Sequence, residues 1–308
     1  MLKYRLLTAL ILIPLVLSIL FYAPRPVFIA SNALAILVAG WEWTSLSKIK
    51  SFFRKFLFLS LLALTLIGSF WASHIILWIA AAWWIIAGVI VLTIRPHSSE
   101  GIEKITPVSK AESVTKETSH QIAPHSKNEG VTKGTLQKIA PPFAGGAVVK
   151  RLRGGVIITG LLILTPTFTA LNLLYDINPE LILWLFLLIW GADSCAYFAG
   201  KLWGKHKLIP HISPGKTWEG FIAALLTCLL IGALASLRNL GLTLTLWLGL
   251  AFIIGVISVL GDLFESLIKR IQGVKDSGSI LPGHGGILDR IDSLTAAAPV
   301  FAFLWILS

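Results

Sequence analysis

Charged side chains are scarce in this sequence. Asp, Glu, Lys and Arg make up 13% of its 308 residues, whereas an average soluble domain carries about 25%. Hydrophobic residues make up 56%, and the mean hydropathy is +0.81. This composition excludes an ordinary soluble protein and predicts an all-α, polytopic membrane protein whose helices cross the bilayer.

Cysteine is also scarce. The two cysteines, Cys195 and Cys228, both lie in apolar segments, and we predict that they are buried thiols that say nothing about the redox compartment. A structural zinc site needs several Cys or His ligands close together. His284 has no such cluster around it in the sequence, which excludes a zinc site there.

Long apolar segments dominate the chain. A membrane-spanning helix needs about 20 apolar residues, and nine segments approach this length. They cover residues 5–23, 27–43, 56–72, 74–94, 154–174, 181–199, 218–237, 242–262 and 293–307. The third and fourth almost touch, which predicts a tight hairpin. The first resembles a signal peptide, but its apolar run is too long and no clear cleavage site follows, so we predict a first span.

The positive charges are distributed unevenly between the loops. If nine spans alternate in direction from a cytoplasmic N-terminus, 24 of the 26 Lys and Arg residues fall in the cytoplasm, and only Arg25 and Arg238 fall outside. Cytoplasmic loops are enriched in Lys and Arg, so this asymmetry supports nine spans and a C-terminus outside. It also explains the net charge of +11 by loop charges that set the topology and attract anionic lipid of the bilayer, so we predict no nucleic acid partner.

One polar region interrupts the apolar pattern. We divide the chain into residues 1–96 with spans 1–4, an insert at 97–150, and a catalytic region at 151–308 with spans 5–9 and two cytoplasmic loops. The insert has too few apolar residues to fold, which predicts a disordered cytoplasmic segment. Within it, Glu112–Lys127 repeats as Glu129–Ala144 at a spacing of 17 residues. The repeat is either an expansion of a tolerated loop or a docking or lipid-surface segment.

The stretch Gly261–Ser293 concentrates the charge that the rest of the chain lacks. It lies between two apolar segments and contains six glycines. Its charged side chains and its histidine are Asp262, Glu265, Lys269, Arg270, Lys275, Asp276, His284, Asp289, Arg290 and Asp292. Charge at the edge of a bilayer is costly and marks a functional site by default, so we predict an active site at a membrane face.

A second polar loop covers Trp190–Phe221. Asp193 lies near the cytoplasmic end of a predicted span, where an acid is a functional candidate. Four lysines follow, including Lys216, together with Ser213 and several glycines. Glycines allow close backbone approach and lysines neutralise phosphate, although a basic loop can also serve topology alone. A P-loop is excluded, because the first glycine of that motif would fall at Pro210.

The spacing of the acidic residues predicts a metal site. On helices, Asp289 and Asp292 share a face, and so do Asp262 and Ser266. Carboxylates at one membrane depth can hold Mg²⁺, which leaves positions open for substrate phosphates. The alternative is that Asp289, Arg290 and Asp292 form ion pairs with nearby Lys and Arg. Metal and positive charge together predict phosphoryl or nucleotidyl transfer at the inner face of a membrane.

A long motif in Gly261–Ser293 resembles the family pattern of bacterial phosphatidate cytidylyltransferases, the CDP-diacylglycerol synthases. The motif reads Ser266-x2-Lys269-Arg270-x4-Lys275-Asp276-x-Gly278-x2-Leu281-Pro282-x-His284-Gly285-Gly286-x2-Asp289-Arg290-x-Asp292. The loop from Gly191 to Trp218, the N-terminal MLKYRL and Trp41-Glu42-Trp43 also resemble this family. The likeness covers nearly the whole chain except about 97–150, and Cys195 stands where a small residue such as glycine is more usual.

The resemblance implies that CTP and phosphatidate give CDP-diacylglycerol and pyrophosphate. It implies a multi-pass homodimer in the bacterial inner membrane, with Mg²⁺ and a second cation site for K⁺. The implied metal ligands are Asp262 and Asp289, supported by Asp292 and Ser266. We expect Lys269 and Arg270 to act in catalysis with the three aspartates. The residues that we expect to bind substrate are Asp193, Ser213, Lys216, Lys275, His284 and Arg290.

Three other functions fit parts of the pattern. A lipid or polyprenol kinase that uses CTP would move the γ-phosphate and release CDP instead of pyrophosphate. A transporter would bind cations at acidic residues inside the membrane, but here the acids lie at the ends of spans beside basic loops. A CDP-alcohol phosphotransferase would carry an Asp-Gly-x2-Ala-Arg run, which this sequence lacks.

Overall fold

The computed structural model describes residues 2–94, 147–274, 277–278, 280 and 285–308. Almost all of the predicted insert, with both copies of the repeat, lies outside these residues, as do Lys275 and His284. The helix after the insert begins at Ala147, which is within the region 97–150 that we assigned to the insert.

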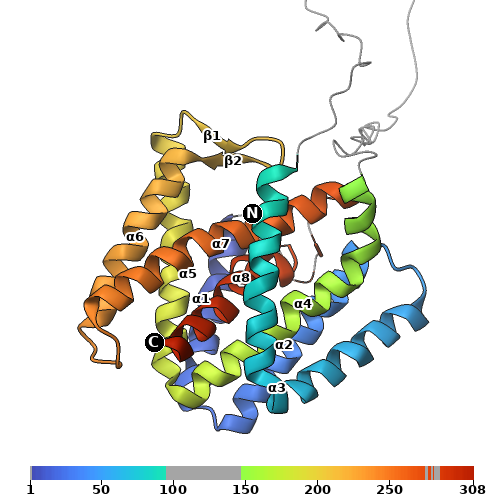
Figure 1. The fold of residues 1–308 in the computed structure, drawn as a ribbon, viewed down its shortest axis with the longest axis horizontal. Coiled ribbons are helices and arrows are strands. Elements are labelled where there is room, and N and C mark those ends of the chain that lie inside the picture. Colours follow the sequence, from blue (N-terminus) through green and yellow to red (C-terminus); the bar gives the residue numbers. More distant parts are fainter. Residues whose placement is uncertain (1, 95–146, 275–276, 279, 281–284) are drawn as a thin grey trace, which may run out of the picture.

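The described chain folds into eight helices and one two-stranded hairpin (Figure 1). The elements, in chain order, are α1 (Leu2–Tyr22), α2 (Arg25–Leu46), α3 (Phe52–Thr93), α4 (Ala147–Ile177), α5 (Pro179–Leu202), β1 (Lys207–Ile209), β2 (Ser213–Thr217), α6 (Trp218–Ser236), α7 (Leu244–Gln272) and α8 (Leu288–Leu307).

Local capping sets the ends of the helices that carry the site. Asn178, Thr217 and Thr243 stand at the N-caps of α5, α6 and α7, and each side chain accepts a hydrogen bond from a backbone N–H of the first turn. Such caps satisfy donors that the helix itself cannot pair. α7 ends at Gly273, whose φ of 68° is the left-handed conformation that glycine adopts at little cost.

α3 covers 42 residues, in two helices that meet at a kink. At about 1.5 Å per residue, its residues extend about 63 Å along the chain, roughly twice the hydrocarbon thickness of a bilayer. Ala72 interrupts it with non-helical φ and ψ of −120° and 24°, at the point where the sequence predicts a turn between two spans. The two halves diverge from this kink (Figure 1), so the turn predicted between the third and fourth spans is a kink at Ala72.

The prediction of an all-α, polytopic membrane protein is confirmed in its main outline. Within the described residues, seven helices are long and apolar enough to cross a membrane, and Leu10–Tyr22 is a shorter apolar helix. Apart from at most two terminal residues, each of the nine predicted spans lies within one of the helices, with two of them in α3. The hairpin of β1 and β2 departs from an all-helical fold. In this hairpin, Lys207 pairs with Thr217 and Ile209 with Ser213.

Two ion pairs lie beside the short connection between α4 and α5. Arg25 Nε lies 2.5 Å from Asp176 Oδ1, and Arg238 Nε lies 2.8 Å from Glu180 Oε1. Asp176 is close to the end of α4 and Glu180 to the start of α5. The two basic residues that the sequence places apart from the other 24 therefore lie at the same end of the molecule.

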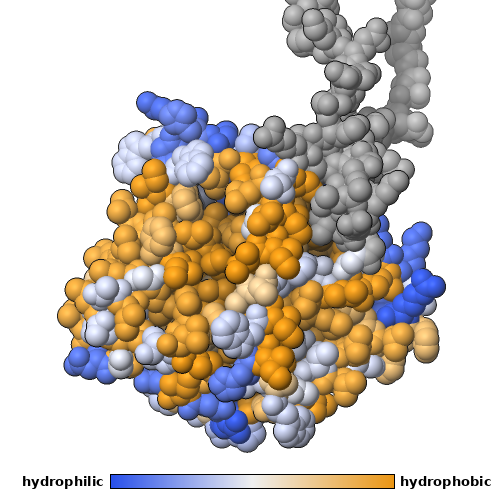
Figure 2. Space-filling model, in the orientation of Figure 1, coloured by the Kyte–Doolittle hydropathy of each residue, from blue (hydrophilic) through white to orange (hydrophobic). Residues whose placement is uncertain are grey.

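The surface between the end with these two ion pairs and the end with the β1–β2 hairpin is apolar. Hydrophobic residues cover most of the visible face and hydrophilic residues gather at its periphery (Figure 2). Large side chains such as Tyr22, Trp71 and Leu92 are more than 70% exposed, whereas Trp43, Trp84 and Trp247 are buried in the core. Exposed apolar area on this scale is typical of a surface that faces lipid.

Candidate active site

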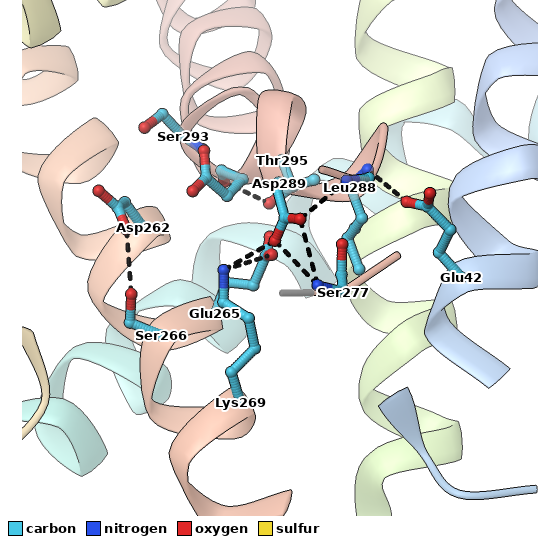
Figure 3. Close-up of polar contacts among 12 residues, drawn as sticks. Glu42, Asp262, Glu265, Ser266, Lys269, Ser277, Leu288, Asp289, Ser293 and Thr295 are labelled. Atoms are coloured by element: carbon cyan, nitrogen blue, oxygen red, sulfur yellow. Dashed lines mark hydrogen bonds and ion pairs between the residues drawn. The ribbon is translucent and has the colours of Figure 1, made fainter. Parts of the chain in front are cut away.

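α7 carries four site residues on one side. Asp262, Glu265, Ser266 and Lys269 follow one another at intervals of three or one residues along the helix, so the three-, four- and seven-residue spacings among them place them on one face. The Ser266 hydroxyl donates a hydrogen bond to Asp262 Oδ1 at 3.2 Å. Farther along the helix, Lys269 is turned toward Asp289 at the start of α8 (Figure 3).

Gly261 allows α7 and α8 to approach closely. A Cβ atom at this position would lie 2.8 Å from the carbonyl oxygen of Asp292 and 2.8 Å from Ala296 Cβ, which is closer than real Cβ atoms come to their neighbours. The absence of a side chain at Gly261 therefore brings the backbone beside Asp262 against the backbone of Asp292.

Lys269 forms ion pairs with two carboxylates from different helices. Its Nζ atom lies 2.9 Å from Asp289 Oδ1 of α8 and 3.2 Å from Glu265 Oε1 of α7. The three side chains are at most 12% exposed. Removing one partner from a buried ion pair leaves an uncompensated charge and is strongly destabilising, so Lys269 joins α7 to α8 at the site.

Asp289 also holds the loop between α7 and α8. Its two oxygens accept hydrogen bonds from the Ser277 N–H at 3.1 Å each, and Oδ2 accepts one from the Gly286 N–H at 2.9 Å (Figure 3). Gly285, with a φ of 83°, makes the turn that permits this. The ion pair that the sequence offered as the alternative to a metal site is present for Asp289, with Lys269 as its partner, and its role as a metal ligand stays a prediction.

Lys216 connects the two polar loops. It extends from β2, and its Nζ atom lies 2.8 Å from Asp262 Oδ2 of α7 and 3.4 Å from the Val259 carbonyl oxygen. The Arg270 Nε atom donates to the carbonyl oxygen of Ile212, at the start of β2, at 3.3 Å. The second loop thus folds against the end of α7, and the two loops that the sequence singles out form one site.

A cavity of about 390 Å³ opens beside the Lys216–Asp262 pair. Four predicted site residues line it: Asp193, Ser213, Lys216 and Asp262. Tyr197 and Phe221 add aromatic surface. Ligand pockets have volumes of about 300–1,000 Å³ and combine apolar walls with a few polar groups, so this cavity has the size and lining of a substrate site.

The acidic residues fit a metal ion that takes most of its ligands from substrate phosphates and water. Among the described residues, no three His, Cys, Asp or Glu side chains come close enough together to enclose an ion. Mg²⁺ usually binds through one or two carboxylates, with waters and substrate phosphates in the other positions. Asp262 fits this requirement, because it lines the cavity and is supported by Ser266.

Glu42 is a site residue that sequence reasoning missed. It belongs to α2 and is only 2% exposed. Its Oε2 atom accepts a hydrogen bond from the Leu288 N–H at 2.8 Å, across 246 residues of sequence. An acid inside an apolar span is a functional candidate by default, and this signal was present in the sequence at Trp41-Glu42-Trp43.

Comparisons with known proteins agree with the resemblance noted in the sequence. Residues 3–307 match the Cytidylyltransferase family. A phosphatidate cytidylyltransferase of Pseudomonas aeruginosa is 34% identical over 313 residues, covering 99% of this chain and 97% of the relative. One of Haemophilus influenzae is 34% identical over 333 residues, covering 99% of each. One of Staphylococcus aureus is 52% identical over 129 residues, 41% of this chain and 49% of the relative. The chain belongs to the cytidylyltransferase family.

Proposed function

We propose that this chain is a membrane enzyme that transfers the cytidylyl group of CTP to phosphatidate, forming CDP-diacylglycerol and pyrophosphate. The observation that carries the proposal is the contact between Lys216 and Asp262 at a cavity of about 390 Å³. It joins a basic Gly-rich loop to an acidic stretch at the end of apolar helices. The family membership and the names of the relatives support it.

The reaction requires two anionic substrates to meet. An oxygen of the phosphatidate phosphate attacks the α-phosphorus of CTP, the bond to the bridging oxygen of the β-phosphate breaks, and pyrophosphate leaves with that electron pair. The attacking oxygen is already ionised and needs no strong general base. The main demand on the protein is positive charge, placed where negative charge gathers in the transition state.

The residues that we assign to this task are cationic. Lys216 lines the cavity, while Lys269 and Arg270 come from the last turn of α7. Ser213 and Asp193 line the same cavity and are positioned to contact bound substrate. We assign Arg290 to phosphate binding, and we extend the same role to Lys275 and His284 on the basis of the motif alone.

Asp262 and Ser266 are the residues that we assign to a Mg²⁺ ion, with Asp289 and Asp292 as the further acidic groups. When bound, the ion would neutralise the charge of the phosphates and of the departing pyrophosphate. Lys216 pairs with Asp262 in this structure. Exchange of that pairing for substrate phosphate would free the aspartate for the metal. A second cation, K⁺, belongs to the same proposal.

We also propose a topology of nine spans in the bacterial inner membrane, with both polar loops and the N-terminus in the cytoplasm and the C-terminus outside. The uneven distribution of Lys and Arg supports it, because cytoplasmic loops are enriched in these residues. CTP then arrives from water, and phosphatidate presents its phosphate while its tails stay in the bilayer. A homodimer completes the proposal.

The test is an assay of purified protein with CTP, phosphatidate and Mg²⁺, comparing the wild type with Asp289→Asn. We expect CDP-diacylglycerol and pyrophosphate from the wild type, and a loss of about 10²–10³ in rate in the variant, because an acidic group assigned to the metal site loses its charge and Lys269 keeps only Glu265 as a charged partner. Asp176→Asn is the matched control, since it removes a carboxylate at the end of α4 that pairs with Arg25 and lies outside the candidate site, and we expect it to keep wild-type activity.

The other outcomes identify a different function or a different site. CDP in place of pyrophosphate would indicate a kinase, and ion flux in proteoliposomes without nucleotide would indicate a transporter. An active wild type with an unaffected Asp289→Asn variant would retain the reaction and remove Asp289 from the site.

A further inference from the structure

Glu42 lies among the elements of the site, yet the proposed reaction gives it no role. It is an acid on α2, a helix that carries no predicted site residue, and its exposed fraction is 2%. Burying a carboxylate at the edge of a membrane is costly unless donors surround it. Its contacts therefore indicate what this side chain does.

The first contact is with the start of α8. The residue at the N-cap of α8 is Ile287, whose side chain makes no capping hydrogen bond. Glu42 Oε2 takes that place from another helix, because it accepts the Leu288 N–H at 2.8 Å (Figure 3). A carboxylate at a helix N-terminus is favourable because it satisfies an unpaired donor and lies at the positive end of the helix dipole.

The second contact is with the loop that precedes α8. Cβ atoms at Gly278 and Gly286 would overlap Glu42 Oε1 and Oε2 respectively. The backbone at these two positions thus lies directly on the carboxylate. The glycines at 278 and 286 in the long motif are explained by Glu42, since no side chain fits between its carboxylate and the loop.

The third contact fixes Glu42 itself. The neighbouring Trp43 is fully buried, and its Nε1–H donates to the Val156 carbonyl oxygen of α4 at 2.7 Å. A Cβ atom at Gly160 would overlap this indole. α2 is therefore held tightly against α4 beside Glu42, which gives the carboxylate a rigid support.

We propose that Glu42 is a positioning residue, whose carboxylate holds the loop and the first turn of α8 so that Asp289 meets Lys269. Asp289 lies one residue after Leu288, whose N–H Glu42 accepts, and Asp289 accepts the Gly286 N–H directly. The inference rests on the proposed function for its effect on catalysis. Its effect on the position of the loop is independent of that function.

The kinetic test compares Glu42→Ala with Glu42→Gln. Glutamine keeps an acceptor of the same length for the Leu288 N–H, and alanine does not. We expect Glu42→Ala to lower kcat per folded molecule about ten- to a hundredfold, with little change in KM for either substrate, and Glu42→Gln to restore most of it. Glu180→Ala, which removes a carboxylate at the other end of the molecule, is the control and keeps wild-type kcat.

A double-mutant cycle tests the contact with the loop. We expect Gly278→Ala to lower kcat in the wild type, because its methyl group displaces the loop from Glu42. In the Glu42→Ala background the same substitution has space, so we expect it to add little. A loss of the same size in both backgrounds would overturn the proposal.

Hydrogen exchange supplies a readout that does not depend on activity. We expect the backbone amides of residues 286–292 to exchange faster in Glu42→Ala than in the wild type, with unchanged exchange in α6. A wild type that forms no CDP-diacylglycerol would remove the proposed function and leave this measurement valid. The positioning role would be overturned if residues 286–292 exchanged at the wild-type rate in Glu42→Ala. It would also be overturned if the variant lost activity only in proportion to its folded fraction, with kcat per folded molecule unchanged.

Discussion

At the scale of single residues, two lysines organise the acidic groups of the site. Lys216 pairs with Asp262 at the cavity, and Lys269 pairs with Glu265 and Asp289. Lys216 is more exposed, at 22%, than Lys269, at 12%. We expect the buried Lys269 to stabilise the fold as well as to neutralise its carboxylate partners, whereas Lys216, at the cavity, can exchange partners when substrate phosphate arrives.

Lys269→Met tests the buried lysine. The substitution keeps most of the side-chain length and leaves Glu265 and Asp289 without their cation, so we expect it to destabilise the protein by about 3–5 kcal/mol. Unfolding in mixed micelles by titration with SDS measures this. The matched control is Lys201→Met at the exposed end of α5, where we expect a change within about 0.5 kcal/mol. Equal effects at the two positions would contradict a buried ion-pair network.

At the scale of elements, the packing of α7 on α8 sets the site. Both helices are apolar for most of their length and carry acids where they meet. Helical periodicity alone places Asp262 beside Ser266, and the close approach at Gly261 adds the backbone of Asp292. The geometry of the acidic groups therefore depends on a residue that has no side chain.

Gly261→Ala tests this packing. Its methyl group would meet the Asp292 carbonyl oxygen and Ala296 Cβ at 2.8 Å, so we expect the helices to separate, with a loss of about 1–3 kcal/mol in stability and a fall in activity. Gly249→Ala is the matched control on the same helix, because a Cβ there meets nothing within 4 Å. Its higher helix propensity should raise stability by up to about 1 kcal/mol. Equal stability of the two variants would show that this contact does not set the helix spacing.

At the scale of the whole molecule, the polar groups divide between two ends. α5 joins them, since its 24 residues span about 36 Å from Glu180, which pairs with Arg238, to the hairpin that carries Lys216. The apolar surface lies between these ends (Figure 2). This arrangement suits a protein in which one end meets a soluble nucleotide and the middle meets lipid.

Replacement of residues 98–146 by a flexible Gly/Ser linker tests whether the rest of the chain is sufficient. We expect activity close to wild type, because none of the residues that we assign to the site lies in this region and shortening a loop changes its closure free energy by only about 1 kcal/mol. Product formation per inserted molecule measures it. A shortened protein that inserts at normal levels but forms no product would assign a role to the repeat-bearing insert.

The sequence alone determined the membrane character and the approximate positions of the apolar helices, and it singled out the acidic stretch as the candidate site. Scarce charge and long apolar runs leave few alternatives to transmembrane helices, and helical periodicity relates residues three or four apart, such as Asp262 and Ser266. The nine apolar segments lie within helices apart from at most two residues at an end. The signals were strong because each depends on composition or on neighbours in the chain.

Only the tertiary structure decided which residues meet across the molecule. Three sets of contacts join segments that no helical spacing relates. They are the ion pair of Lys216 with Asp262, the hydrogen bonds from Ser277 and Gly286 to Asp289, and the hydrogen bond from Leu288 to Glu42. Glu42 and Leu288 are 246 residues apart. Such contacts depend on how helices pack, and their packing is decided by shape, as at Gly261, which a linear pattern of polar and apolar residues does not encode.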